Sequence, residues 1–328
     1  MRARIILVLA IIGFTVGCGS VSEPVSVSVA PVDASPAGVT EATAAPVTTA
    51  PTTAPTTAPT DCDKEASLRP DRHAAPGAMP PGSTMAAIAA RGRLIAGVDQ
   101  SQFLFGFRNP ATGALEGFDI DIAREIARAI FGDPNRIEFR VVEAGQREAV
   151  LRSGEVDVVV RTFSINCARM QNVAFSTVYF NADQRILVSK GSGIDSAAAL
   201  AGKRACAVSG TTSLAKLYGL DPRPIVVGAP TWTDCLVMLQ QGQIDAIGTD
   251  GAVLGGLAAQ DANVRIVGES LGIEPYGVGI KKENEDLVRF VNGVLEQIRA
   301  DGTWQRLYDA NLQSLGPSPG PPPARYRE

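Results

Sequence analysis

Hydrophobic and polar positions between residues 83 and 312 follow two alternating periods. Short runs rich in β-branched residues predict strands, and apolar residues recurring every three or four positions predict amphipathic helices. The predicted strands cover 93–98, 137–142, 156–161, 203–208, 224–228 and 244–249. The predicted helices cover 118–131, 145–152, a segment that starts at Thr211, 231–241 and 285–312. Because strands and helices alternate, we expect an α/β fold built on parallel sheet.

The second half of this series repeats the first. The segment LRSGEVDVVVRT (151–162) matches LQQGQIDAIGTD (239–250), since each ends a helix, places a glycine at its C-cap and opens a strand with aspartate. Two similar lobes are the economical explanation. Apolar runs near 184–190 and 274–280 stand on either side of the second series. We therefore expect the chain to cross twice between the lobes and to form a two-stranded hinge beside a cleft.

The N-terminal residues have the pattern of an export signal. Arg2 and Arg4 precede an apolar run at 5–14, which is too short to span a bilayer. The run is followed by TVGC, which resembles the end of a bacterial lipoprotein signal. We expect removal of residues 1–17 and lipidation of Cys18; an ordinary secretory signal cut nearby is the alternative.

Two further segments have compositions that do not predict a packed core. Residues 18–60 consist largely of Ala, Thr, Pro, Ser and Val, and should form an extended, partly polyproline-II tether on the order of 100 Å long. Its Thr-Pro repeats are either glycosylated or a bare spacer. The Pro-rich residues 315–328 are expected to be disordered.

Charge and histidine content argue against several classes of function. The formal net charge of −4 gives no electrostatic case for nucleic acid. His73 is the only histidine, whereas Ser-His triads, most acid-base sites and zinc sites use imidazole. The sequence also has no CxxC pair, so we expect no metal ion and no cofactor.

The segment GFDIDIAREIARAI (117–130) places Asp119 and Asp121 in the first turn of a predicted helix. Carboxylates at i and i+2 point about 200° apart on a helix, so they do not readily share one ion. The first turn also favours acidic residues through the helix dipole. We interpret the pair as structural.

This segment also fits the signature of the family 3 extracellular solute-binding proteins, the polar amino acid receptors of ABC importers. DVVVRTFSINCARMQNVAFSTVYF (157–180) resembles the second hallmark of that family, and the resemblance covers residues 83–312. With the lipobox and tether, it is nearest in type to glutamate- or glutamine-binding lipoproteins of actinobacteria. It implies a two-lobe, type II periplasmic-binding-protein fold, with lobe one at 61–186 and 279–314 and lobe two at 187–278.

The resemblance also implies ligand-binding residues. Arg169 matches the arginine that clamps the α-carboxylate, a task suited to a guanidinium. Asp250 matches the carboxylate that receives the α-ammonium. Ser164 and the backbone of Thr162 match lobe-one positions that bond both ends of an amino acid.

Thr211 and Thr212 begin a helix whose N-terminus suits the same α-carboxylate. Each of these assignments has a structural alternative. Arg169 could be a surface ion-pair partner, and Thr212 and Asp250 could be helix caps.

The sequence departs from the family where neutral ligands are often held between aromatic rings. One such position is Gln102 and the other is Ala144. Arg161 adds a cation beside the cleft, and a side-chain carboxylate on the ligand would offset its burial, so we favour glutamate or aspartate over glutamine or asparagine. An internal acidic partner for Arg161 is the alternative. Phe105 and Phe107 are expected to wall the pocket unless they are core residues.

Four cysteines remain outside the reducing cytosol and allow three disulfide pairings. Cys206 lies in the opening strand of lobe two, and Cys235 lies in the first turn of the helix after its next strand. Their adjacency favours this pair, and Cys62 with Cys167 then follows by elimination.

The resemblance implies a monomeric, lipid-anchored receptor on the outer face of the cytoplasmic membrane. It would close on an amino acid and deliver it to an ABC permease, without enzymatic activity. The alternatives are a sensor that signals through a membrane partner, and a cleft enzyme on the same fold. An enzyme needs a general acid or base, and Asp250 paired with an ammonium is poorly suited to that role.

Overall fold

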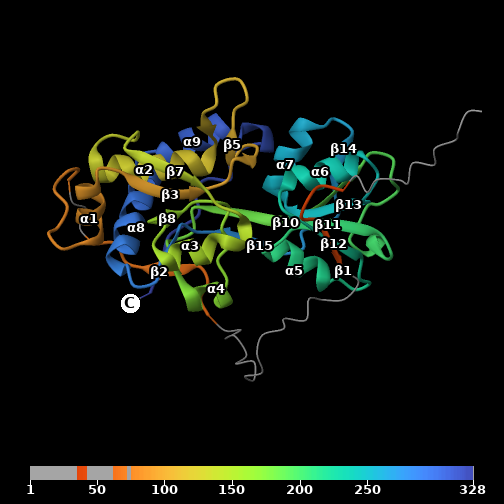
Figure 1. The fold of residues 1–328 in the computed structure, drawn as a ribbon, viewed down its shortest axis with the longest axis horizontal. Helices are drawn as coiled ribbons and strands as arrows, with labels where there is room; N and C mark the ends of the chain where they lie inside the picture. The colour runs from red at the N-terminus through yellow and green to blue at the C-terminus, as the bar shows by residue number, and fades with distance from the viewer. Residues whose placement is uncertain (1–34, 43–61, 72–74, 328) are drawn as a thin grey trace, which may run out of the picture. The chain divides into compact units, whose positions relative to one another are not determined.

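Two β-sheets flanked by helices organise the described part of a computed structural model, residues 35–42, 62–71 and 75–327 (Figure 1). The sheet of lobe one has the order β7 Ile137–Val141, β3 Leu94–Val98, β8 Val158–Val159, β16 Gly279–Lys281 and β9 Val173–Phe175. The sheet of lobe two has the order β1 Thr40–Ala42, β12 Ile225–Ala229, β11 Arg204–Val208, β13 Ala246–Asp250, β10 Phe180–Ser189 and β14 Val264–Val267.

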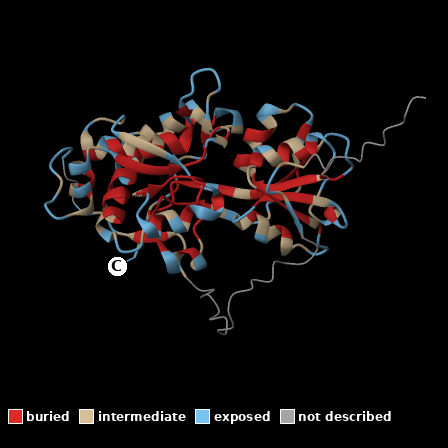
Figure 2. Ribbon diagram, viewed as in Figure 1, coloured by how far each residue is buried: buried red, intermediate tan, exposed pale blue. Residues whose placement is uncertain are grey.

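Helices cover both sheets, and the strands they cover are largely buried (Figure 2). The helices of lobe one are α1 Thr84–Arg91, α2 Phe118–Phe131, α3 Arg147–Ser153, α4 Cys167–Asn172, α8 Glu285–Ala300 and α9 Thr303–Asn311, and those of lobe two are α5 Thr212–Tyr218, α6 Trp232–Gln240 and α7 Gly251–Gln260. Short 3-10 turns lie at Ala144–Gln146, Ala198–Leu200 and Gln313–Leu315. Small strands β4 Ser101–Gln102, β5 Gly106–Arg108 and β6 Leu115–Glu116 form a separate sheet.

The two sheets repeat one topology, as the internal repeat predicts. In lobe one β3 pairs in parallel with β7 and β8, and in lobe two β11 pairs in parallel with β12 and β13. The repeated aspartates do the same work in both lobes. The Asp157 carboxylate accepts the backbone N–H of Ile95 at 2.7 Å, and the Asp245 carboxylate accepts that of Arg204 at 2.8 Å. Each aspartate thus fixes the start of its strand against the opening strand of its lobe.

The predicted helix bounds hold for α2, which runs from Phe118 to Phe131. Its apolar residues Phe118, Ile122, Ile126 and Ile130 are buried in the lobe-one core. Gly117 precedes the helix with φ +125°, and a Cβ there would overlap the Phe105 carbonyl. Gly132 ends the helix in the left-handed conformation. Glycine at both ends, with an apolar face between them, fixes this element locally.

The chain crosses between the lobes along β10 and returns along β15 Ile273–Tyr276. The first half of β10 pairs with β15, from Phe180 opposite Tyr276 to Asp183 opposite Ile273. The second half pairs with β13 and β14 inside lobe two. In Figure 1 the long green arrow of β10 continues into the group of β11, β12 and β13. These two strands are the two-stranded hinge.

Three segments differ from the sequence predictions. Residues 325–327 form strand β17, which pairs in parallel with β2 Ala66–Leu68, so the prediction of a disordered tail is wrong there. Arg325 binds Asp63 at 2.8 Å and Glu65 at 3.1 Å, and these contacts supply order that composition did not predict. Residues 40–42 of the predicted tether pair with β12.

The third difference is in the C-terminal helix predicted to run through residues 285–312. It divides into α8 and α9 at Gly302, whose φ of +76° is left-handed. Glycine adopts this conformation without the steric cost that other residues meet.

Both predicted disulfides are confirmed. Cys62 is bonded to Cys167, and Cys206 to Cys235, with Cα atoms 5.7 Å and 5.8 Å apart. The predicted signal, the lipidation site Cys18 and His73 lie outside the described residues. Among the helices that are described, none is long and apolar enough to cross a membrane.

Candidate functional site

A small cavity lies between the lobes, beside the hinge. Its volume is about 10 Å³, which is room for about one water molecule, so a larger molecule does not fit in the cavity as it stands. Polar side chains dominate its wall. Lobe one contributes Arg147, Arg161, Thr162 and Ser164, and lobe two contributes Thr211, Thr212, Ser213, Trp232, Asp250 and Val253.

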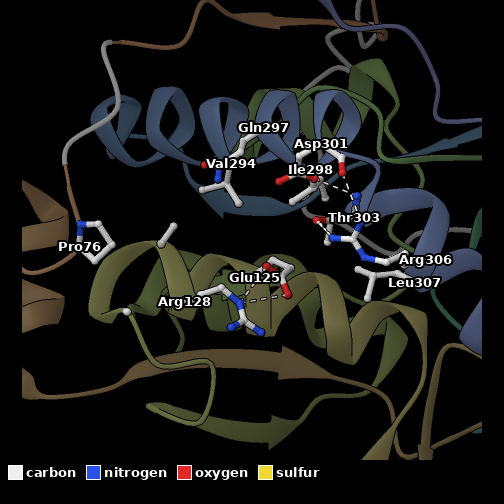
Figure 3. A pocket seen from close by; sticks show the side chains of 12 residues that line it. Pro76, Glu125, Arg128, Val294, Gln297, Ile298, Asp301, Thr303, Arg306 and Leu307 are labelled. Atoms are coloured by element: carbon white, nitrogen blue, oxygen red, sulfur yellow. Dashed lines mark hydrogen bonds and ion pairs between the residues drawn. The ribbon is translucent and has the colours of Figure 1, made fainter.

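Larger hollows occur elsewhere on the described surface. One of them, of about 700 Å³, lies between α2 and the α8–α9 junction (Figure 3). Its charged groups already have partners, because Arg128 pairs with Glu125 at 3.1 Å and Asp301 accepts the Thr303 N–H at 2.8 Å. A second hollow, of about 580 Å³, lies on the α7 side of β10.

Unsatisfied polar atoms single out the small interlobe cavity. Four of the eight buried side-chain nitrogen or oxygen atoms that lack a hydrogen bond in the described residues lie in or beside it. They are Asp99 Oδ2, Gln102 Nε2, Arg161 Nε and Asp250 Oδ1. None belongs to a residue lining the hollow of Figure 3. Buried polar groups without partners are costly, so they mark the place where a polar ligand would be stabilised.

Arg169 is buried rather than a surface residue, with 7% of its area exposed. It lies in α4, where Asn166 caps the helix by accepting the Arg169 N–H at 2.9 Å. Its guanidinium donates to the Ser164 carbonyl at 2.6 Å and, across the cleft, to the Gly210 carbonyl at 3.3 Å. Burial lowers the pKa of Arg169, while Glu148 and Glu274 act in the opposite direction.

Asp250 lies opposite, at the end of β13 and the start of α7. Its side chain makes no helix-cap hydrogen bond, so capping does not explain it. Instead it accepts a short hydrogen bond from the Tyr276 hydroxyl, which leaves Oδ1 unpartnered. Burial and then the charge of Glu274 raise the pKa of Asp250 to about 7.

Arg161 is not the uncompensated cation that the sequence argument for an acidic ligand assumed. Its guanidinium lies 2.7 Å from the Asp99 carboxylate, and both side chains are 5% exposed. The alternative of an internal acidic partner for Arg161 is therefore correct. The charge of Arg161 gives no reason to favour an acidic ligand. The Arg161 guanidinium nitrogen and Asp99 Oδ2 form an ion pair, but their geometry is not that of a hydrogen bond.

The backbone turn at Thr162 is held in place by Asp119, which lies in the first turn of α2. Thr162 has a φ of +37°, a conformation that costs energy in a β-branched residue. The buried Asp119 carboxylate accepts the Thr162 N–H at 2.8 Å and the Tyr179 hydroxyl at 2.7 Å. The Thr162 hydroxyl donates to Gln102 Oε1 at 3.2 Å, which leaves Gln102 Nε2 free. Asp119 is thus structural, as predicted, and it positions part of the cavity wall.

The threonines at the start of α5 have different roles. Thr211 is the N-cap, because its hydroxyl accepts the Leu214 N–H at 3.1 Å and donates to the Val208 carbonyl at 2.6 Å. Thr212 donates to Glu274 at 2.9 Å, and its hydroxyl lies 3.4 Å from that of Ser164 in the other lobe. Cap and cavity-lining roles therefore coexist here.

Phe105 does not line the cavity, so its assignment to the pocket wall is corrected. It is fully buried in the lobe-one core and packs edge-to-face on Phe118, Phe180 and Tyr276. Phe107 is half-buried on β5, with its ring 5.3 Å from that of Phe103.

Sequence reasoning missed four cavity residues, namely Arg147, Ser213, Trp232 and Val253. Two of them are large. Trp232, at the first position of α6, supplies an aromatic wall from lobe two. Arg147, at the first position of α3, is a buried residue that lines the cavity from lobe one. Neither carries a motif, and only the meeting of the two lobes brings them together. Within the described residues, no group of three or more His, Cys, Asp or Glu could hold a metal ion.

Two similar α/β lobes, a two-stranded hinge and a polar cavity between the lobes define a type II periplasmic-binding-protein fold. Residues 94–314 match the bacterial extracellular solute-binding proteins of family 3, and the chain belongs to this family.

Relatives and solved structures agree with this assignment. The chain is 37% identical over 226 residues to the ABC transporter glutamine-binding protein GlnH of Bacillus subtilis, which covers 69% of this chain and 83% of the relative. It is 33% identical to the glutamate-binding protein GluB of Corynebacterium glutamicum, covering 70% and 82%. The solute receptor for L-cysteine of Neisseria gonorrhoeae superimposes with a TM-score of 0.69 at 28% identity, covering 72% of this chain and 98% of that one.

Proposed function

We propose that this protein is an extracytoplasmic receptor that holds an amino acid zwitterion in the interlobe cavity. Arg169 would bind the α-carboxylate and Asp250 the α-ammonium, while Ser164 and the Thr162 backbone would bond both ends of the ligand. The observation that carries the proposal is the pair of buried, opposite charges on different lobes, one of which has an unpartnered oxygen. The two charged groups belong to different lobes and can both contact one small ligand only when the lobes meet, so binding favours the closed form.

The preferred ligands are glutamate and aspartate, then glutamine and asparagine. The names of the relatives support glutamate or glutamine. The polar wall, to which Arg161, Thr211 and Thr212 contribute, supports a ligand with a polar side chain. Gln102, which accepts from the lining residue Thr162, adds an unpartnered Nε2 beside that wall. A micromolar Kd, suited to scavenging, corresponds to about −8 kcal/mol.

The receptor would be anchored by a lipid on Cys18 and would pass its ligand to an ABC permease. The relative from Bacillus subtilis, whose name includes an ABC transporter, supports this role. Metabolic labelling with a fatty-acid analogue, compared between the full chain and Cys18→Ser, tests the anchor. Equal labelling of both would contradict it.

Calorimetric titration with a panel of amino acids tests the binding proposal. We expect saturable heat with an acidic or amide amino acid, loss of that heat in Arg169→Ala and Asp250→Ala, and retention in Arg140→Ala. Arg140 is an exposed arginine on β7 and controls for loss of one positive charge. Binding that survives Arg169→Ala would contradict the proposed role of Arg169.

A further inference from the structure

Arg147 is a buried cation that has no carboxylate within ion-pair distance among the described residues. Only 3% of its area is exposed, yet none of the ion pairs includes it. Its nitrogens donate to four backbone carbonyls instead. These belong to Ala144 at 2.7 Å, Arg161 at 3.3 Å, Thr162 at 3.5 Å and Gly210 at 3.3 Å.

The surroundings stabilise this charge only in part. Arg147 lies over the Phe163 ring at 4.4 Å, which is a favourable cation–π contact, but Arg169 lies 4.9 Å from the same ring and brings a like charge close. Burial, then the like charges of Arg169 and Arg161, lower the pKa of Arg147 well below its usual value. A guanidinium nevertheless stays protonated in proteins, so Arg147 remains a buried cation. Asp99 and Glu148 offset the like charges in part, but neither lies within ion-pair distance of Arg147.

Arg147, Arg161 and Arg169 differ in whether a carboxylate of the protein already neutralises their charge. Asp99 neutralises Arg161 at 2.7 Å, and Arg169 forms an ion pair with Glu148 at 3.9 Å. Arg147 lines the cavity, and its bond to the Gly210 carbonyl crosses from lobe one to lobe two. That bond must break when the lobes separate, which frees an N–H of Arg147 toward the cavity.

The Gly210 carbonyl oxygen accepts from both Arg147 and Arg169, at 3.3 Å each. One partly negative oxygen therefore lies within reach of two guanidinium groups. A ligand with two carboxylates could meet both cations, and a full negative charge would compensate Arg147 better than a neutral carbonyl does.

We propose that Arg147 is the specificity-determining residue of the cavity and that it selects amino acids whose side chain ends in a carboxylate. This inference rests on the proposed function, in which Arg169 and Asp250 take the two α-groups. The ligand then offers two negative groups and one positive group to Arg147, Arg169 and Asp250. An amide side chain has the same shape without the charge, so it gains less from Arg147.

Calorimetry on the wild type and on Arg147→Gln, with glutamate, aspartate, glutamine and asparagine, tests the proposal. We expect the wild type to bind an acid more tightly than its isosteric amide. Arg147→Gln should weaken the acids by about tenfold or more and the amides by less than about threefold. Arg152→Gln, an exposed arginine on the same helix, should leave the preference unchanged.

Arg147→Lys keeps a charge at the site and should keep the preference for acids. Equal losses for acids and amides in Arg147→Gln, or no loss at all, would overturn the inference. A wild type that prefers the amides would overturn it even if Arg147→Gln did not fold. A wild type that binds no amino acid would instead refute the proposed function.

Discussion

Gly210 of lobe two faces Gly145 of lobe one so closely that a Cβ on Gly210 would lie 2.5 Å from the Gly145 Cα. The contact forms only when the lobes close, because the two glycines belong to different lobes. Glycine at 210 also has a φ of +74°. Closure of the lobes therefore requires a residue without a side chain at position 210.

Gly210→Ala should hold the lobes apart. Overpacking a contact of this kind costs about 1–3 kcal/mol, equal to about a 5- to 150-fold loss of ligand affinity. Small-angle scattering should show a smaller ligand-induced decrease in the radius of gyration. Gly202→Ala is the matched control, since Gly202 has a φ of +67° but no atom within 4 Å of a Cβ. If both variants lost affinity equally, backbone strain rather than the interlobe contact would be responsible.

Ligand affinity should fall as the pH drops below about 7. Burial and Glu274 raise the pKa of Asp250 to about 7, and an ammonium ligand requires the ionised form. Below this pH a proton must leave before the ligand binds, so affinity should weaken by about tenfold per pH unit. Calorimetry at pH 8 and pH 6, in buffers of different ionisation enthalpy, measures both the affinity and the released proton. Constant affinity across this range would contradict the role of Asp250.

Asp250→Asn should abolish binding while stabilising the ligand-free protein at pH 8. The folded-state pKa is raised, so the folded protein binds more protons than the unfolded chain between about pH 4 and 7, and its stability falls as the pH rises through this window. Asparagine removes the buried charge, and a gain of roughly 1–4 kcal/mol is expected at pH 8. Urea unfolding at pH 8 and pH 5 measures it, and the gain should shrink at pH 5.

Asp99→Asn should strongly destabilise the fold. It leaves Arg161 as a buried charge without its partner, which costs about 3–5 kcal/mol. Glu138→Gln breaks the exposed pair with Arg93 and should cost far less, because solvent screens an exposed pair. Chemical unfolding compares the two variants. Similar small losses would show that Asp99 and Arg161 do not depend on each other.

Sequence reasoning succeeded where local rules decide the structure. The α2 bounds follow from an apolar face closed by Gly117 and Gly132. Asp157 and Asp245 occupy equivalent positions in the two lobes, because each accepts a backbone N–H that fixes the start of its strand. Both disulfides followed from strand adjacency in an α/β lobe and from elimination.

It failed where distant segments meet. Asp99 and Arg161 lie on different elements, so their pairing was invisible in the sequence, and the argument based on an unpaired Arg161 was wrong. Arg147 lacks a motif and becomes part of the cavity only through its contacts with the carbonyls of Arg161, Thr162 and Gly210. The tail strand β17 depends on its partner β2, more than 250 residues earlier.

The crystal structure of the protein bound to glutamate tests the central claim most directly. We expect the α-carboxylate on the Arg169 guanidinium and the α-ammonium on Asp250 Oδ1, with the two lobes closed around the ligand. A ligand bound elsewhere, or one that leaves Arg169 and Asp250 without contact, would contradict the account.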